Sequence, residues 1–344
     1  MTDKRRLSLG LDRYSGLWIW AALIVVFGVL RPDTFLTSTT LHSVAAQQAI
    51  VAILALGLVI PLATGVFDLS IGANVGFAAV FVTLLQSDHG LGMWSAIALT
   101  VLVSALIGAI NGFVVVVLKV DSFIATLGSS SIVIATQTIV TKLQQPVPPP
   151  DAGWRSLTQT EFFGFQIIVV YMLALGLLLW WVLEYTPFGR YVYATGGNRE
   201  AARLSGVRVD KLIFLSLVTS AVIGSIAGIL YASRTAPSLT FGNTLLLPAF
   251  AAAFLGTTQL KPGKFNVWGT IIAIYALATG IKGLQLINNQ RWLDDMFNGV
   301  ALIGAVALAG ARLRAAQHQR RIKAVEVDGG GSDADTGVLA GTHR

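Results

Sequence analysis

Long blocks without charged side chains dominate the sequence and constrain its fold more than any other feature. A helix that crosses the hydrocarbon core of a membrane needs about 20 predominantly apolar residues. In this 344-residue chain, 54% of residues are hydrophobic and only 12% are charged, which argues against a soluble enzyme and against a disordered chain. We therefore predict an all-α polytopic membrane protein with about ten transmembrane helices. The ten blocks cover residues 14–30, 44–63, 66–86, 93–118, 122–141, 162–183, 212–233, 244–260, 265–287 and 296–311.

The cations divide unequally between the two sides that these spans define. Ten spans place both termini on one side, which holds 18 Lys and Arg against five on the other, with Lys282 inside a span. Because cytoplasmic loops carry the excess of Lys and Arg, we predict that both termini are cytoplasmic. The expected parts are a cytoplasmic N-terminal segment 1–13, a transmembrane permease domain 14–311 with an external loop 142–161 and an internal loop 184–211, and a basic, then disordered, cytoplasmic tail 312–344.

Motifs of the common catalytic classes are absent from the sequence. There is no GxxxxGK[ST] phosphate loop, no HExxH motif and no cysteine, and the four histidines are scattered over loops and tail. We expect no catalytic residue, metal or cofactor, no ATP hydrolysis through a phosphate loop and no nucleic-acid partner. Ionisable residues at membrane depth are nearly absent, which argues against a proton-coupled pump.

Asp68 is one of two ionisable residues within the apolar blocks. A charge at mid-bilayer costs about 2.5–3.5 kcal/mol, so Asp68 should lie at a helix end, in a break or facing water. Pro61, Gly65 and Gly72 favour a break between two helices. Asp68 is then either part of a structured turn near the transport pathway or cytoplasmic gate, or a helix N-cap. The candidate break or pathway residues are Asp68, Ser70, Gly72, Asn74 and Asn111, of which Asn111 either stabilises helix packing or lines the pathway.

The second such residue, Lys282, can extend toward the interface or pair with Asp294 or Asp295. Small residues recur four positions apart in three blocks, a pattern that lets helices approach closely in lipid. We expect these patterns to serve packing within the chain rather than dimerisation through any one of them. The three pairs are Gly72 and Gly76, Gly108 and Gly112, and Gly224 and Gly228.

The internal loop contains the most specific local pattern. Gly196 and Gly197 predict a chain break, Asn198 a cap, residues 199–205 a short helix and Gly206 its C′ position. Such a helix is either a docking element, with Ala201 and Ala202 small enough for a groove to close around them, or a surface loop without a partner. The candidate coupling residues are Gly196, Gly197, Asn198, Arg199, Glu200, Ala201, Ala202, Arg203, Leu204, Ser205 and Gly206, in which Arg199, Glu200 and Arg203 supply rim charges.

Three of these segments resemble the permease subunits of ribose/xylose-type sugar ABC importers. Residues 67–72 (FDLSIG) resemble the D-L-S-x-G stretch of that family, and residues 194–207 (ATGGNREAARLSGV) resemble its cytoplasmic coupling loop. Residues 253–258 (AFLGTT) with Gly269 and Thr270 form a third match. The chain departs from the family at residues 65–67, where a glycine pair is usual, and at residues 256–263, which replace G-G-T-S-L-x-G-G.

This resemblance implies a permease subunit in the bacterial cytoplasmic (inner) membrane that imports a monosaccharide or related polyol. The implied partners are ABC ATP-binding subunits in the cytoplasm, an external solute-binding protein, and a second permease that is either another copy or a similar chain. Permeases for branched-chain amino acids or nucleosides share the broad fold and remain alternatives. An ion-coupled secondary transporter would need buried carboxylates, of which only Asp68 is available. A structural or receptor-like membrane protein is the remaining class, and the capped internal helix argues against it.

Overall fold

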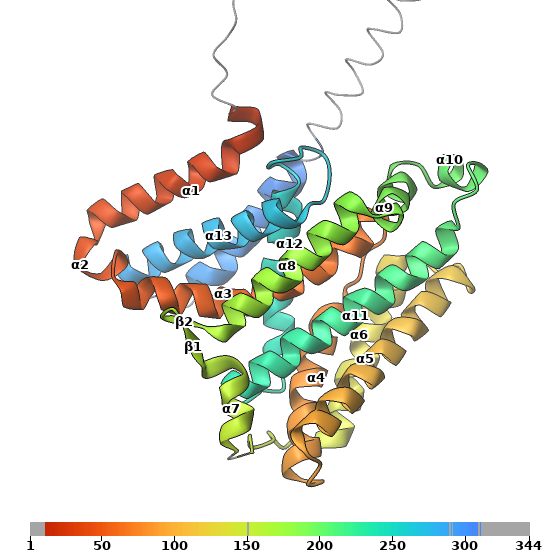
Figure 1. Ribbon diagram of the computed structural model, residues 1–344, viewed down its shortest axis with the longest axis horizontal. Coiled ribbons are helices and arrows are strands. Elements are labelled where there is room, and N and C mark those ends of the chain that lie inside the picture. Colours follow the sequence, from red (N-terminus) through yellow and green to blue (C-terminus); the bar gives the residue numbers. More distant parts are fainter. Residues whose placement is uncertain (1–10, 150, 289, 291, 309, 311–344) are drawn as a thin grey trace, which may run out of the picture.

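The protein is a bundle of helices with one small hairpin (Figure 1). The computed structural model describes residues 11–149, 151–288, 290, 292–308 and 310. Its helices are α1 (Leu11–Leu30), α2 (Pro32–Phe35), α3 (Ser38–Ala63), α4 (Ser70–Ser87), α5 (Met93–Val116), α6 (Ser122–Thr141), α7 (Ala152–Gln159), α8 (Ile167–Tyr185), α9 (Pro187–Gly197), α10 (Arg199–Leu204), α11 (Val209–Arg234), α12 (Phe241–Gly256) and α13 (Val267–Ile287). Residues 292–308 are also helical, and β1 (Glu161–Phe162) pairs antiparallel with β2 (Phe165–Gln166).

Seven helices in the described part of the chain are long and apolar enough to cross a membrane: α3, α4, α5, α6, α8, α11 and α13. Two apolar helical stretches are shorter, Gly16–Leu30 within α1 and the whole of α12. In lipid, a helix satisfies its backbone hydrogen bonds internally, which is why these blocks fold as helices despite their β-branched residues. The prediction of an all-α polytopic membrane protein is confirmed.

Some predicted boundaries are wrong. The block predicted at 66–86 becomes helical only at Ser70, because the preceding residues form a non-helical segment. The described part of α1 includes the last residues of the predicted N-terminal segment 1–13, and its apolar stretch is Gly16–Leu30. The loop 142–161, which was predicted to be external, contains a helix that was not predicted, α7, and Asp151 caps it by accepting from the Gly153 amide at 2.9 Å. The rest of the N-terminal segment and the tail 312–344 lie outside the described residues.

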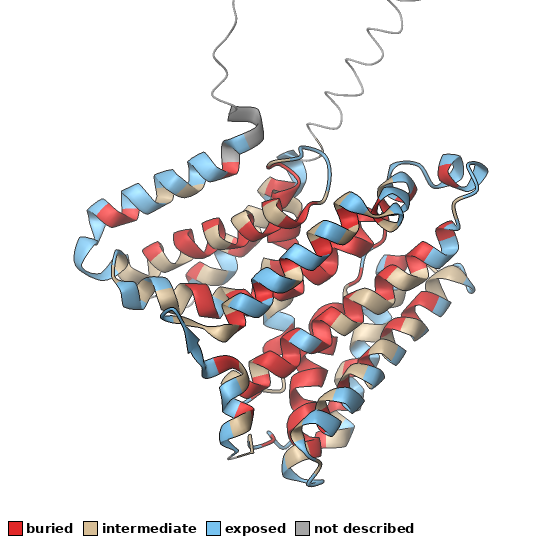
Figure 2. Cartoon of the chain, in the orientation of Figure 1, coloured by how far each residue is buried: buried red, intermediate tan, exposed pale blue. Residues whose placement is uncertain are grey.

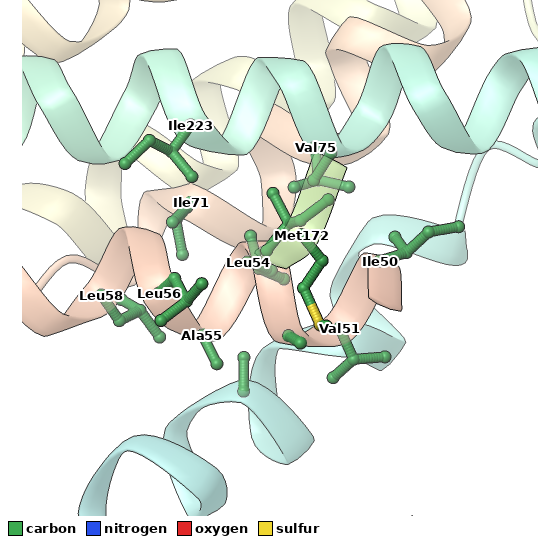
Figure 3. Packing of buried hydrophobic residues seen from close by; sticks show 14 of the residues in the cluster. Ile50, Val51, Leu54, Ala55, Leu56, Leu58, Ile71, Val75, Met172 and Ile223 are labelled. Carbon is green, nitrogen blue, oxygen red and sulfur yellow. The ribbon is translucent and has the colours of Figure 1, made fainter. Parts of the chain in front are cut away.

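The core of the bundle lies around α3, α4 and α11. Figure 2 shows mostly buried residues along α3 and α11 and mostly exposed residues along α1. Side chains from these elements and from α8 interdigitate, as the close view in Figure 3 shows for Leu54, Ile71, Met172 and Ile223. By contrast, α5 and α6 keep large apolar side chains exposed, as expected of helices that face lipid or another subunit.

Each small-residue pair lies at a helix contact within the chain, as predicted. A Cβ on Gly108 would lie 2.8 Å from the Leu217 carbonyl oxygen of α11. A Cβ on Gly228 would lie 2.4 Å from the Val75 carbonyl oxygen of α4, and Gly72 faces α12 in the same way. These glycines let backbones approach more closely than any side chain would permit. The contacts join α5 to α11, α11 to α4, and α4 to α12.

Candidate coupling site

The loop 184–211, which was predicted to be internal, contains two short helices, α9 and α10, joined at Asn198. The extended backbone of Asn198 ends α9, and its side chain accepts from the Ala201 amide at 3.0 Å, which caps α10. At the other end of α10, Gly206 has φ +82°, and the Val207 amide bonds to the Ala202 carbonyl at 3.0 Å. Both predicted caps of the short helix are therefore present. The predicted break at Gly196 and Gly197 is wrong, because both glycines belong to the last turn of α9 and the chain breaks one residue later.

The two faces of α10 differ sharply in exposure. Ala202 is 5% exposed and packs with Val66, Val209 and other apolar residues under the helix. Ala201 is exposed on the opposite side, and Leu204 is 88% exposed. A large apolar side chain held in water on a capped helix is a feature of contact surfaces. The interpretation of Ala202 as a docking residue is therefore wrong: it packs inward, while Ala201 and Leu204 face outward.

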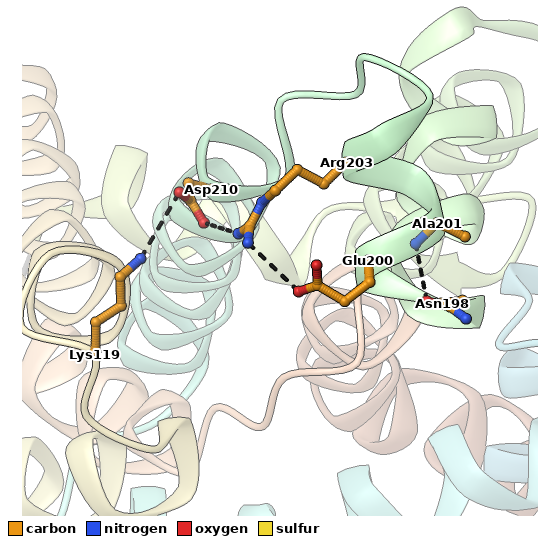
Figure 4. Close-up of polar contacts among 6 residues, drawn as sticks. All are labelled: Lys119, Asn198, Glu200, Ala201, Arg203 and Asp210. Atoms are coloured by element: carbon orange, nitrogen blue, oxygen red, sulfur yellow. Dashed lines mark hydrogen bonds and ion pairs between the residues drawn. The ribbon is translucent and has the colours of Figure 1, made fainter.

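Ion pairs fasten α10 to its neighbours (Figure 4). Arg203 lies 3.1 Å from Asp210 at the start of α11 and 3.5 Å from Glu200 within α10. Lys119, in the turn between α5 and α6, lies 3.8 Å from the same Asp210. All four side chains are at least half exposed, so each pair contributes under about 1 kcal/mol. Together they orient α10 on α11.

The α9–α10 unit rests on the turn that follows α3. The Arg199 guanidinium donates to the Gly65 carbonyl at 2.6 Å, and Gly65 has φ +77°, a backbone conformation suited to glycine. A Cβ on Gly196 would lie 2.1 Å from the Ala63 carbonyl oxygen, so the two backbones touch. Arg199 was predicted to be a rim charge, but its guanidinium links the unit to the transmembrane bundle.

A second contact joins α9 to the turn between α12 and α13. The Tyr193 hydroxyl donates to the Phe265 carbonyl at 2.8 Å. Burial, with Glu184 nearby, raises the pKa of Tyr193 above its ordinary value, so the hydroxyl remains a donor. Lys261 in the same turn forms an ion pair with Glu184. The unit therefore contacts two separate turns of the bundle.

Between α3 and α4, residues 64–69 form a break whose backbone is bonded by side chains. The Phe67 amide donates to the Ser122 hydroxyl at 3.1 Å, and the Leu69 amide donates to the Thr126 hydroxyl at 3.0 Å. Both hydroxyls belong to α6, which thus replaces the missing helical hydrogen bonds. The break is consequently an ordered part of the bundle.

Asp68 lies in this break and is 1% exposed. Its Oδ1 accepts from the Ser70 amide at 3.0 Å and from the Ser70 hydroxyl at 2.6 Å. The Asn111 amide of α5 donates to that same hydroxyl at 2.8 Å. The N-cap residue of α4 is Leu69, so Asp68 secures the first turn from one position earlier. Three predicted residues, Asp68, Ser70 and Asn111, therefore form one buried network.

The other two predicted break residues serve helix contacts. Gly72 packs against α12, where Gly242 and Leu246 approach it. The Asn74 amide donates to the Ala221 carbonyl of α11 at 2.7 Å, while its oxygen has no partner among the described residues.

An aromatic cluster beside the break was not predicted. The ring centroid of Phe67 lies 6.4 Å from that of Phe123, 6.5 Å from that of Phe250 and 6.4 Å from that of Phe254. Phe67 is 39% exposed, so this cluster reaches the protein surface. Its members come from three distant segments, and no local sequence signal connects them.

These features define the class of protein: a multi-pass permease component of a transport system, in which a stiff extramembrane unit rests on the transmembrane bundle. The family described as "Branched-chain amino acid transport system / permease component" matches residues 40–306, and the chain belongs to this family. As a permease component of the bacterial cytoplasmic membrane, it is not the ATP-hydrolysing subunit, which agrees with the sequence analysis.

Similar proteins include autoinducer 2 import system permease proteins named LsrC. The one from Klebsiella pneumoniae is 33% identical over 313 residues, which cover 90% of this chain and 90% of that protein. The one from an Enterobacter species is 32% identical over 311 residues, 88% of this chain and 89% of its own. The one from Yersinia pestis is 30% identical, with 86% and 83% covered. No solved structure matches the chain.

Proposed function

We propose that this permease imports a small polyhydroxylated, sugar-like solute, driven by ATP-binding subunits that dock on α9 and α10. The resemblance of residues 67–72 and 194–207 to sugar permeases supports the solute class. Its relatives are named for the import of autoinducer 2, which supports a small signal or sugar-like cargo. The observation that carries the docking proposal is the capped α9–α10 unit, with Leu204 exposed and Arg199 bonded to the α3–α4 turn.

Transport requires that movement of the ATP-binding subunits reach the membrane helices. A displaced α9–α10 unit would move Gly65 through Arg199 and would press on Ala63 through Gly196. Both contacts lie within five residues of Asp68 and its buried network. The break at residues 64–69 is thus the nearest part of the bundle to be displaced when α9 and α10 move. Phe67 lies in the same segment and would pass this displacement to the aromatic cluster.

The proposed topology has ten spans with both termini in the cytoplasm. The seven long apolar helices, Gly16–Leu30, α12 and residues 292–308 supply ten candidates. The 26-residue α11 is about 39 Å long and joins α10 at one end to α7 at the other, which supports opposite sides for loops 184–211 and 142–161. The excess of cations beside α10 supports the cytoplasmic assignment of that side.

The proposed assembly contains two permeases, either two copies of this chain or this chain with a similar one. The exposed apolar faces of α5 and α6 support contact with a second permease or with lipid. A solute-binding protein would deliver cargo at the side of α7 and the β1–β2 hairpin.

Docking is tested by replacing Leu204 with serine. We expect Leu204→Ser to reduce co-purification of the ATP-binding subunit and to uncouple ATP hydrolysis from uptake. The matched control is Phe163→Ser, because Phe163 is also 88% exposed but lies in the hairpin on the opposite side. If equal amounts of the ATP-binding subunit co-purify with wild type, Leu204→Ser and Phe163→Ser, the docking site lies elsewhere.

The solute class is tested by uptake into vesicles that contain the complete transporter. We expect uptake of at least one of D-ribose, D-xylose and autoinducer 2. The family description favours branched-chain amino acids as the second candidate. Uptake of L-leucine without uptake of any of the three polyols would decide for that candidate.

A further inference from the structure

A polar cavity lies between α3, α12, α13 and the helix at 292–308. Its volume is about 280 Å³, and apolar side chains of α3, α12 and α13 form part of its wall. The rest of the wall is unusually polar for a chain with so few ionisable residues inside its apolar blocks. The polar side chains that line it, apart from Thr244, are Gln47, Gln48, Lys282, Gln285, Asp294, Asp295 and Asn298.

The cavity lies near the end of the bundle opposite the coupling site. The helix α13 begins beside Phe265, which accepts from Tyr193 of α9, and Lys282 is about 22 Å further along it. The helix α3 ends at Ala63 beside Gly196, and Gln48 lies about 22 Å before that end. In the proposed topology, this places the cavity in the external half of the membrane domain.

Four of the lining side chains make no hydrogen bond or ion pair with any residue that the structure describes: Gln48, Lys282, Asp295 and Asn298. Asn298 is 8% exposed, yet its amide makes no hydrogen bond with any residue that the structure describes. Lys282 is half-buried, and no described carboxylate lies within ion-pair distance of its ammonium group, so the predicted pair with Asp294 or Asp295 is not formed. Gln285 instead donates to both oxygens of Asp294, at 2.7 and 2.9 Å.

Unpaired polar groups at this depth are costly unless a ligand or water satisfies them. The cavity offers amide donors and acceptors, carboxylate acceptors and one ammonium donor, together with apolar wall. Hydroxyl groups both donate and accept, so a polyhydroxylated solute can bond with all three kinds of group. The volume is just below the usual range of about 300–1,000 Å³ for ligand pockets, which suits a small solute.

We propose that this cavity is an entry subsite that binds the polyhydroxylated solute after its release outside, with Asn298 as a specificity-determining residue. The proposal rests on the proposed function. The exposed Gln47 and Asp295 form the mouth, and the buried Asn298 lies deeper in the cavity.

The first test is Asn298→Leu, measured as uptake of D-ribose, D-xylose and autoinducer 2 by vesicles with saturating solute-binding protein. Asn298 bonds to no described residue, so a purely structural role predicts unchanged or higher stability and unchanged kinetics. We expect KM for the transported polyol to rise about tenfold, as for the loss of one or two hydrogen bonds, with ATPase co-purification unchanged. The control is Gln86→Leu, because Gln86 is a half-buried amide that bonds to the Val82 carbonyl of its own helix.

The second test uses the absence of cysteine from the sequence. We expect the single-cysteine variant Asp295→Cys to react with an impermeant maleimide from outside, and the transported polyol to slow that reaction. Unchanged KM in Asn298→Leu together with unprotected labelling, while wild type still transports a polyol, would overturn the subsite alone. Wild-type vesicles that take up L-leucine and no polyol would overturn the proposed function and the subsite with it.

Discussion

Gly196 and Gly197 are adjacent glycines in the last turn of α9, and we predict that the same substitution has opposite effects at the two positions. A Cβ at position 196 would lie 2.1 Å from the Ala63 carbonyl oxygen, whereas a Cβ at position 197 would meet nothing within 4 Å. Non-bonded heavy atoms prefer about 3.5–4.0 Å, so Gly196→Ala must push α9 from the α3–α4 turn by more than about 1 Å. Forced contacts of this kind typically cost about 1–3 kcal/mol.

Alanine also favours helix over glycine by up to about 1 kcal/mol, and this gain applies to both variants. We therefore expect Gly197→Ala to be neutral or slightly stabilising. Gly196→Ala should be destabilising by up to about 2 kcal/mol, and the displacement should lengthen the bond between Arg199 and Gly65.

The assay has two readouts on the complete transporter in lipid vesicles or nanodiscs. The thermal midpoint reports stability, and the number of ATP molecules hydrolysed per solute transported reports coupling. We expect Gly196→Ala to lower the midpoint by a few degrees and to raise the ATP requirement, with Gly197→Ala close to wild type. Indistinguishable midpoints and coupling ratios for the two variants would refute the close contact between α9 and the α3–α4 turn.

Two further predictions concern the break and the topology. Asp68→Leu should reduce membrane expression and uptake, because it removes the acceptor for the Ser70 amide and hydroxyl, a loss of about 1–3 kcal/mol in stability. Asp68→Asn keeps an oxygen acceptor and should have a milder effect. Equal uptake by wild type and Asp68→Leu at equal expression would contradict this prediction. In intact cells, an impermeant thiol reagent should label Ser156→Cys but not Ser205→Cys, and the reverse pattern would invert the proposed orientation.

Much of the local structure followed from the sequence because its hydrogen bonds join residues close in the chain. Asn198 and Gly206 cap α10 through bonds that span three to five residues, so their spacing was sufficient to predict them. The apolar blocks predicted helices because lipid leaves a backbone few other ways to satisfy its hydrogen bonds. The boundary at residue 66 was predicted wrongly because hydropathy does not distinguish an apolar helix from an apolar segment whose amides bond to α6.

Composition and local pattern by themselves determined that this chain is a polytopic membrane protein with a short capped helix in the loop 184–211. Only the tertiary structure decided which side of that helix is free, because the burial of Ala202 depends on Val66 and Val209, which belong to other segments. The same is true of the bond from Arg199 to Gly65, which joins residues 134 positions apart, and of the polar cavity, which four helices assemble. Such contacts form only when helices pack against one another. The residues near each position in the sequence therefore do not predict which distant residue it will contact.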